Sequence, residues 1–183
     1  MGESGPKARK PRTDQIRNRE RLLVAAREVF RAEGASLEAV ARKAGLGIGT
    51  LYRHFPTRES LYQAVYEREV EELVRLAEAM GAEEGLGRWM MAALDMMATK
   101  KGMIAALAPV IDPAAPFYSE QSARMRSALA SLHARAVVAG SMRPDVTPED
   151  LMRILIGLSY GPGADPTRSQ LLLEVFLTGL TRP

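Results

Sequence analysis

The side chains best suited to chemistry with a partner lie in a short stretch around residue 50. At helical spacing, Thr50, Arg53 and His54 share one side of this stretch. Leu51 and Phe55 point to the opposite side, so the hydroxyl, guanidinium and imidazole groups are left for a partner. A guanidinium donates to both O6 and N7 of guanine, and small, hydroxyl and cationic groups suit the major groove of DNA. We therefore expect this side to bind DNA; the alternative is an ordinary exposed helix face.

Two glycines in the same stretch favour a close approach by a partner. Gly47 and Gly49 lie at the start of the expected helix or inside it, where each costs about 1 kcal/mol relative to alanine. That cost is understandable if another molecule must come close to the backbone. Tyr52 lies at the edge of this side, either near the partner or packed at the rim.

The elements that position this stretch follow a helix-turn-helix pattern. Ala41, Gly45 and Leu51 supply a small residue where helices cross, a turn residue that tolerates positive φ, and an apolar anchor. Any helical hairpin can show these three residues, so the pattern is weak by itself. No convincing strand pattern is present, and we expect an all-α fold. Periodic apolar residues predict helices over about 13–33, 37–44, 47–54, 57–80, 86–100, 103–110, 119–139, 147–160 and 167–180.

Charge is unevenly distributed along the 183 residues. Residues 1–58 hold 13 Lys and Arg against 6 Asp and Glu, whereas the rest of the chain holds 12 against 16. A basic amino-terminal third on an acidic body favours a polyanion partner for that third. Residues 1–12 are rich in Gly, Pro and basic side chains, and we expect a flexible arm there that either follows DNA or stays unbound.

Composition argues against several other classes of protein. The chain has no Cys and only two His, so we expect no metal site, and no cofactor is expected either. The glycine run 45–49 follows a helix rather than a strand and lacks the Lys-Ser/Thr of phosphate-binding loops. An enzyme is therefore not expected, although Asp95, Glu120 and His133 remain a candidate cluster. The apolar runs are too short to cross a membrane and no signal peptide is visible, so the expected location is the cytoplasm.

The run AGLGIGTLYRHFPTRESL, from Ala44 to Leu61, resembles the signature of the TetR family of transcriptional regulators. The upstream segment, with LEAVA at residues 37–41, has the matching layout. The resemblance covers residues 14–61, and the rest of the chain is similar to the family only in size and helical layout. It implies an N-terminal three-helix helix-turn-helix DNA-binding domain followed by a larger helical effector-binding and dimerisation domain. The expected parts are the arm at 1–12, the DNA-binding domain at 13–60 and the second domain at 61–183.

The resemblance also implies roles for individual residues. In the family, residues matching Thr50 and His54 commonly approach bases or phosphates, and the one matching Tyr52 typically holds phosphate. Arg58 stands where lysine is usual and is expected to bind the DNA backbone. Ile48 departs from the polar or basic residue common there, so it either contacts a thymine methyl or packs. The residues expected at DNA, including two helix starts that can receive phosphate, are Ser36, Lys43, Gly47, Ile48, Thr50, Tyr52, Arg53, His54, Thr57 and Arg58.

For the second domain, the resemblance implies an effector pocket and a homodimer formed through the last two helices. Bulky, adaptable side chains are the expected pocket lining, although a Met stripe at helical spacing is more often core. Those residues are Trp89, Met96, Met97, Met103, Phe117, Met125 and His133. The expected dimer contacts, for which intrachain core is the alternative, are Leu151, Leu155, Leu158, Leu172, Val175 and Phe176.

The function that the resemblance implies is sequence-specific regulation of transcription. The expected protein is a ligand-responsive repressor that binds a palindromic DNA operator as a homodimer and is released by a small hydrophobic effector. Activation is the alternative direction of control. Two rival classes are an enzyme and a helical protein-interaction module whose basic face is incidental.

Overall fold

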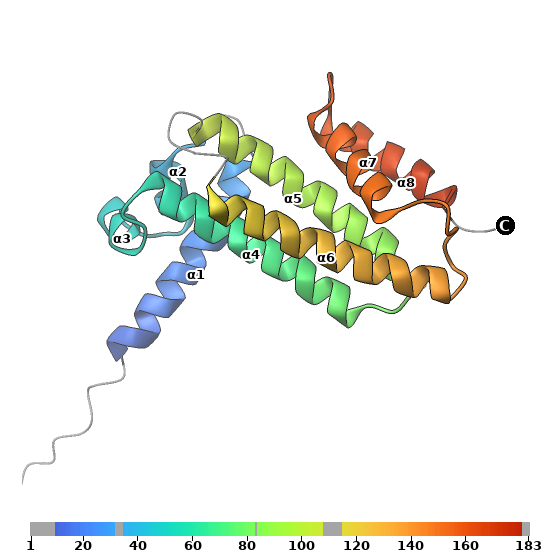
Figure 1. Ribbon diagram of the computed structural model, residues 1–183. Helices are drawn as coiled ribbons and strands as arrows, with labels where there is room; N and C mark the ends of the chain where they lie inside the picture. The colour runs from blue at the N-terminus through green and yellow to red at the C-terminus, as the bar shows by residue number, and fades with distance from the viewer. Residues whose placement is uncertain (1–9, 32–34, 83, 108–114, 181–183) are drawn as a thin grey trace, which may run out of the picture. The chain divides into compact units, whose positions relative to one another are not determined.

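The computed structural model describes residues 10–31, 35–82, 84–107 and 115–180 (Figure 1). Within these ranges every regular element is an α-helix, which confirms the predicted all-α fold. The helices are α1 (Lys10–Phe30), α2 (Leu37–Lys43), α3 (Ile48–His54), α4 (Arg58–Ala79), α5 (Gly85–Leu107), α6 (Pro116–Val138), α7 (Pro148–Tyr160) and α8 (Pro166–Thr178). No helix in the described ranges has the length and apolar character needed to span a lipid bilayer.

The helices group into two compact units. The first contains Met1–Val65 together with Gly102–Val110, and the second contains Tyr66–Lys101 together with Ile111–Pro183. The expected boundary lies near residue 60, at a single point in the chain. The two compact units meet within α4 and α5, since each of these helices contributes residues to both units.

The core of the first unit is made by α1, α2 and α3, which pack against one another. Large buried side chains of this core come from all three helices and from the residue that ends α3. Burying each one stabilises the unit by about 1.5–3 kcal/mol. They are Leu22, Phe30, Leu37, Val40, Leu51 and Phe55, each at most 2% exposed.

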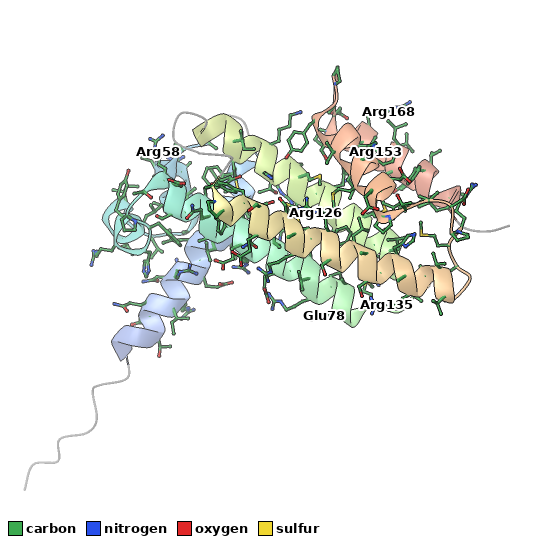
Figure 2. The ribbon with its side chains drawn as sticks, viewed as in Figure 1. Arg58, Glu78, Arg126, Arg135, Arg153 and Arg168 are labelled. Atoms are coloured by element: carbon green, nitrogen blue, oxygen red, sulfur yellow. The ribbon has the colours of Figure 1, made fainter. Side chains whose placement is uncertain are left out.

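The second unit is held together by apolar packing and by polar contacts onto α4. Trp89 of α5 is fully buried, and its indole Nε1 donates to the carbonyl oxygen of Leu73 at 2.9 Å. Arg124 of α6 pairs with Glu71 of α4, and Arg135 donates to the carbonyl oxygen of Ala77. In Figure 2, Arg135 lies at the end of the unit where α4 finishes. These contacts fix α4, α5 and α6 as neighbours, while α7 packs on α6 and α8 on α7.

Helix starts follow the capping residues in the sequence. The hydroxyl of Thr147 accepts from Asp150 N, and the Asp150 carboxylate accepts from Thr147 N, so the two form a capping box with Pro148 at the first helical position. The bond from the Thr147 hydroxyl is the main cause of a lowered pKa for Asp150. Asp165 caps α8, which therefore begins at Pro166, one residue before the expected start.

The predicted break near residue 100 is wrong, because α5 runs without interruption from Gly85 to Leu107. Gly102 lies inside the helix at a close approach to α1. A Cβ atom at Gly102 would lie 1.8 Å from the carbonyl oxygen of Phe30, so a larger side chain does not fit. This glycine is explained by tertiary packing rather than by a helix end.

Two other helix starts differ from expectation. The first helix begins at Lys10, inside the expected flexible arm, and ends at Phe30, whereas its expected end at residue 33 lies outside the described residues. Helix α6 begins at Pro116, three residues before the expected start at residue 119. Proline is favoured in the first turn of a helix, because the N–H it lacks has no partner there.

Candidate nucleic-acid interface

Helices α2 and α3 are joined by a tight turn at Gly45. Ser36 begins α2 by accepting from Ala39 N at 3.1 Å. Gly45 then adopts φ of +63°, the left-handed conformation expected of a turn glycine, and Leu46 N donates to Ala41 O at 2.9 Å. Gly47 begins α3 without a side-chain cap. The predicted helix-turn-helix is confirmed, with Gly45 as its turn glycine.

Helix α3 has one buried side and one open side. Leu51 is fully buried, which pins the helix to the core. On the other side Ile48 is 38% exposed and Tyr52 is 43% exposed, and Arg53 is also exposed. Thr50 and His54 are half-buried, so they lie at the borders of the open side. Gly47 and Gly49 are exposed too, and a Cβ atom at either position would meet no heavy atom of the described chain within 4 Å.

The cations near α3 differ in how they are engaged. Lys43 pairs with Glu28 at 2.8 Å, and this hydrogen-bonded pair lowers the pKa of the Glu28 carboxyl. Arg53 donates from Nε to Gly49 O at 3.3 Å, which leaves its terminal nitrogens for other acceptors. Arg58 is exposed in the first turn of α4, and no ion pair to it occurs within the described ranges. Arg53 and Arg58 are therefore the cations most available to a polyanion here.

The hydroxyl of Thr57 serves the start of α4. It accepts from Ser60 N at 3.0 Å, while Ser60 Oγ accepts from Thr57 N at 3.2 Å. The His54 ring lies against Phe55, with ring centroids 6.4 Å apart. The polar groups of Thr57 are therefore engaged in capping the start of α4.

Two arginines of α1 have a positioning role that sequence reasoning missed. Arg21 donates from Nη2 to Ala44 O at 2.5 Å and reaches Gly45 O at 3.5 Å, so it holds the turn before α3. The guanidinium of Arg19 lies 5.3 Å from the centroid of the Phe55 ring, just after α3. In the sequence these residues count only toward the basic charge, because a contact between positions more than 20 residues apart leaves no local pattern.

The expected pocket residues of the second domain lie mostly in core. Trp89, Met96, Met97, Met103 and Met125 are each at most 6% exposed, and Phe117 is half-buried. The Met103 position belongs to the first unit, apart from the others. His133 Nε2 lies 2.7 Å from Val146 O, so this ring nitrogen already has a partner within the chain. None of these residues lines the cavity that the second unit shows between α6 and α7.

The expected dimer residues divide between core and surface. Leu151 and Leu155 are fully buried within the chain, as expected if they belong to its own core. Leu158 and Phe176 are half-buried. Leu172 is 42% exposed and Val175 is 64% exposed. The large exposed side chains of the last two helices, here called the α7–α8 apolar set, are Ile156, Tyr160, Leu171, Leu172 and Val175.

A short exposed helix that follows a tight turn and presents arginine, glycine and tyrosine defines a helix-turn-helix DNA-binding protein. Residues 22–65 match the family model described as bacterial regulatory proteins, tetR family. Residues 81–182 match the model of the SbtR-like transcriptional regulator C-terminal domain. The chain belongs to the TetR family of transcriptional regulators.

Solved structures and a curated relative agree with this assignment. The TetR transcriptional regulator SCO0520 from Streptomyces coelicolor is 36% identical, with 89% of this chain and 98% of that one covered and a TM-score of 0.74. A TetR regulatory protein from Mycobacterium vanbaalenii is 32% identical, with coverage of 93% and 99% and a TM-score of 0.74. The regulator UidR of Escherichia coli K12 is 26% identical over 179 residues, with coverage of 92% and 91%.

Proposed function

We propose that this regulator is a repressor that binds a palindromic DNA operator as a homodimer and leaves it when a small hydrophobic effector binds. The observation that carries the proposal is the open side of α3, where two exposed glycines stand beside the available guanidinium of Arg53. A surface without side-chain bulk lets a helix backbone come close to base edges. We place this activity in the cytoplasm, with DNA as partner and no cofactor.

Each side chain of the open side has a proposed part in binding. Arg53 donates to guanine O6 and N7 in the major groove. Ile48 contacts a thymine methyl, since it is too exposed to serve as core packing. Tyr52 and Arg58 bind phosphate, and Thr50 and His54 approach the groove from the borders of the open side. The starts of α2 and α4, at Ser36 and Thr57, present backbone N–H groups to phosphate.

The homodimer is proposed to form through the α7–α8 apolar set. Exposed Leu172 and Val175 lie within one turn of α8, and Ile156 and Tyr160 lie one turn apart on α7. Pairing with the same surface of a second copy removes this apolar area from water. In the resulting two-fold dimer, each copy of α3 reads one half-site of an inverted repeat.

Effector control is proposed to act by linkage. Helix α4 contributes residues to both units, so it connects the DNA-binding unit to the effector-binding unit through one continuous element. The effector binds more tightly to a dimer whose two α3 helices cannot fit successive major grooves than to the dimer that fits DNA. This difference in effector affinity between the two dimer states sets how far DNA affinity falls. Repression follows if the operator overlaps a promoter.

Selection of bound sequences from random duplex DNA, with the full-length protein, tests the proposal. We expect an enriched inverted repeat whose affinity falls steeply between 50 and 200 mM salt. Arg53→Ala should relax the preference at one base step by about 1–3 kcal/mol, whereas Arg88→Ala, which removes an exposed charge from α5, should leave it unchanged. Enriched sequences without two-fold symmetry, or no retained duplex at low salt, would refute the proposal and favour a protein-interaction module.

Gly49→Ala tests the close approach separately. Because no chain atom lies near this position, the substitution should raise the free energy of unfolding by up to about 1 kcal/mol. The same methyl group should weaken operator binding, since it stands between the helix and the bases. Thermal unfolding and fluorescence anisotropy on one preparation measure both effects. Unchanged operator affinity would show that the glycine serves no close contact.

A further inference from the structure

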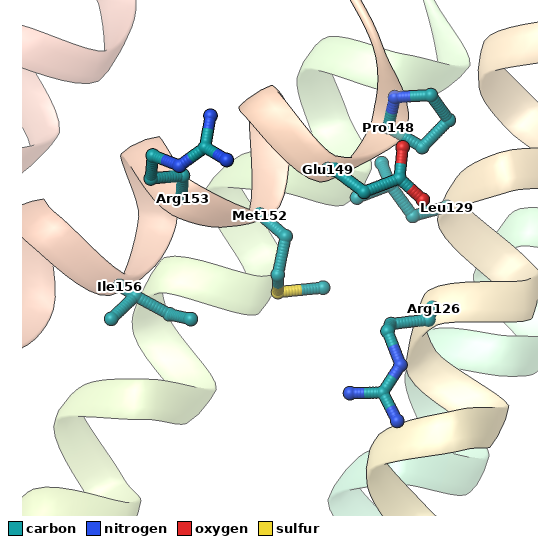
Figure 3. Close-up of a pocket in the computed structure, with 7 residues that line it drawn as sticks. All are labelled: Arg126, Leu129, Pro148, Glu149, Met152, Arg153 and Ile156. Atoms are coloured by element: carbon teal, nitrogen blue, oxygen red, sulfur yellow. The ribbon is translucent and has the colours of Figure 1, made fainter.

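We infer that the cavity between α6 and α7 binds a small molecule with an apolar body and one anionic group, such as a monocarboxylate. The cavity has a volume of about 280 Å³ and is lined by residues of α6 and α7 that face the space between the two helices (Figure 3). This volume lies near the lower end of the range for ligand sites, which fits a ligand of fragment size. The lining residues are Arg126, Leu129, Pro148, Glu149, Met152, Arg153 and Ile156.

The walls of the cavity are largely apolar. Leu129 of α6 is 1% exposed, so it forms a fixed floor. Met152 and Ile156 of α7 lie one turn apart and supply the facing wall. In Figure 3 the side chain of Met152 extends into the space between the helices. A thioether side chain adapts its shape to an apolar ligand, so this wall favours an alkyl or aryl body rather than a polar one.

Three charged side chains line the cavity, and two of them have a structural explanation. Arg153 pairs with Asp150 at 2.5 Å. Glu149 lies in the first turn of α7, where the helix dipole stabilises a carboxylate. Arg126, in the middle of α6, has no hydrogen bond or ion pair to any described residue, and Figure 3 shows its guanidinium extending into the gap from the α6 side. An anionic group on the ligand would give this guanidinium a charge-assisted partner beside the apolar floor.

The cavity also adjoins the surface proposed for dimerisation. Ile156 lines the cavity and belongs to the α7–α8 apolar set. A ligand that packs against Ile156 therefore touches the helix on which a second copy would rest. The inference that the ligand binds is argued from the cavity alone, whereas any effect of the ligand on DNA affinity rests on the function proposed above.

Three small-molecule probes, each with eight carbon atoms, test the inference on the full-length protein: octanoate, 1-octanol and octylamine. Isothermal titration calorimetry without DNA measures their affinities. We expect octanoate to bind about tenfold more tightly than 1-octanol, because one charge-assisted hydrogen bond to Arg126 is added. Arg126→Gln should reduce the affinity for octanoate to that for 1-octanol. The affinity for 1-octanol itself should stay unchanged. The control variant Arg88→Gln removes an exposed charge from α5, outside the cavity lining, and should change neither affinity.

Filling the cavity gives a second, independent readout. Met152→Trp should weaken the binding of octanoate and of 1-octanol to the same degree. As the control for folding, circular dichroism should show a helical content equal to that of the wild type. No binding of octanoate, equal affinity for octanoate and 1-octanol, a preference for octylamine, or an Arg126→Gln variant that binds like the wild type would each overturn the inference.

The same probes separate this inference from the proposed function. If octanoate binds as expected but leaves operator affinity unchanged, the cavity is a ligand site and effector control through it is refuted. If no operator is found, calorimetry without DNA still tests whether the cavity binds the ligand. Operator release by octanoate that persists in both Arg126→Gln and Met152→Trp would overturn the cavity as the site and leave effector control in place.

Discussion

Replacing Arg21 with alanine removes a contact that holds the turn before α3 while leaving the open side of α3 untouched. The bond from Arg21 Nη2 to Ala44 O is 2.5 Å long and partly buried, and the one to Gly45 O is longer and exposed. A partly buried bond from a charged donor contributes about 1 kcal/mol after exchange with water. We therefore expect the free energy of unfolding to fall by about 1 kcal/mol and operator affinity to fall about fivefold.

The salt dependence of binding distinguishes this positioning role from a phosphate contact. Each lost phosphate contact reduces the slope of log K against log salt by about 0.9. Arg58→Ala should show that reduction, whereas Arg21→Ala should weaken binding with an unchanged slope. Both substitutions remove one positive charge from the same unit, so each is the other's control. Fluorescence anisotropy with a labelled operator at four or five salt concentrations measures both slopes. A reduction for Arg21→Ala equal to that for Arg58→Ala would refute the reasoning.

Three further predictions concern stability, assembly and titration. Gly102→Ala should lower the free energy of unfolding by about 3 kcal/mol in urea denaturation, because the added methyl would overlap the carbonyl of Phe30; a change below 0.5 kcal/mol would contradict the packing shown here. Val175→Glu should convert the proposed dimer to monomer in sedimentation velocity, while Val138→Glu, which changes an 89% exposed side chain at the end of α6, should sediment as the wild type. The Tyr160 side chain is 41% exposed, and partial burial of the rest of it raises the pKa of its hydroxyl to about 12. The stabilisation from the neutral hydroxyl is therefore complete below pH 10 and is lost as pH rises from 10 toward 12, since the unfolded chain ionises first. Absorbance at 295 nm should show a late-titrating tyrosine that disappears in Tyr160→Phe, and a titration complete by pH 11 would count against it.

Local chemistry explains why the helix-turn-helix could be predicted from the sequence. A turn glycine, a serine cap and an apolar anchor act within a few residues of each other, and Gly45, Ser36 and Leu51 have those roles in the structure. The split near residue 100 was wrong because Gly102 is required by the end of α1, some 70 positions earlier in the chain. A contact at that separation is invisible to periodicity.

In the second domain too, the sequence does not reveal which apolar residues are buried and which are exposed. Helical spacing marks Leu151, Leu155 and Val175 equally as apolar, yet the first two are buried in the chain and the third is exposed. Which apolar stripe faces the chain's own core depends on the neighbouring helices, and spacing alone does not contain that information. The methionine-rich stretch has the same ambiguity, and Met96 and Met97 lie in core.

The buried indole of Trp89 makes intrinsic fluorescence a reporter of one unit alone. The chain has one tryptophan, and it lies in the second unit with its N–H bonded to a carbonyl of α4. Emission therefore follows the melting of that unit and is silent about the DNA-binding helices, whereas far-ultraviolet dichroism averages over both. Coincident transitions in the two signals would mean that the chain denatures as one cooperative block, and separated transitions would give each unit its own melting temperature without any label.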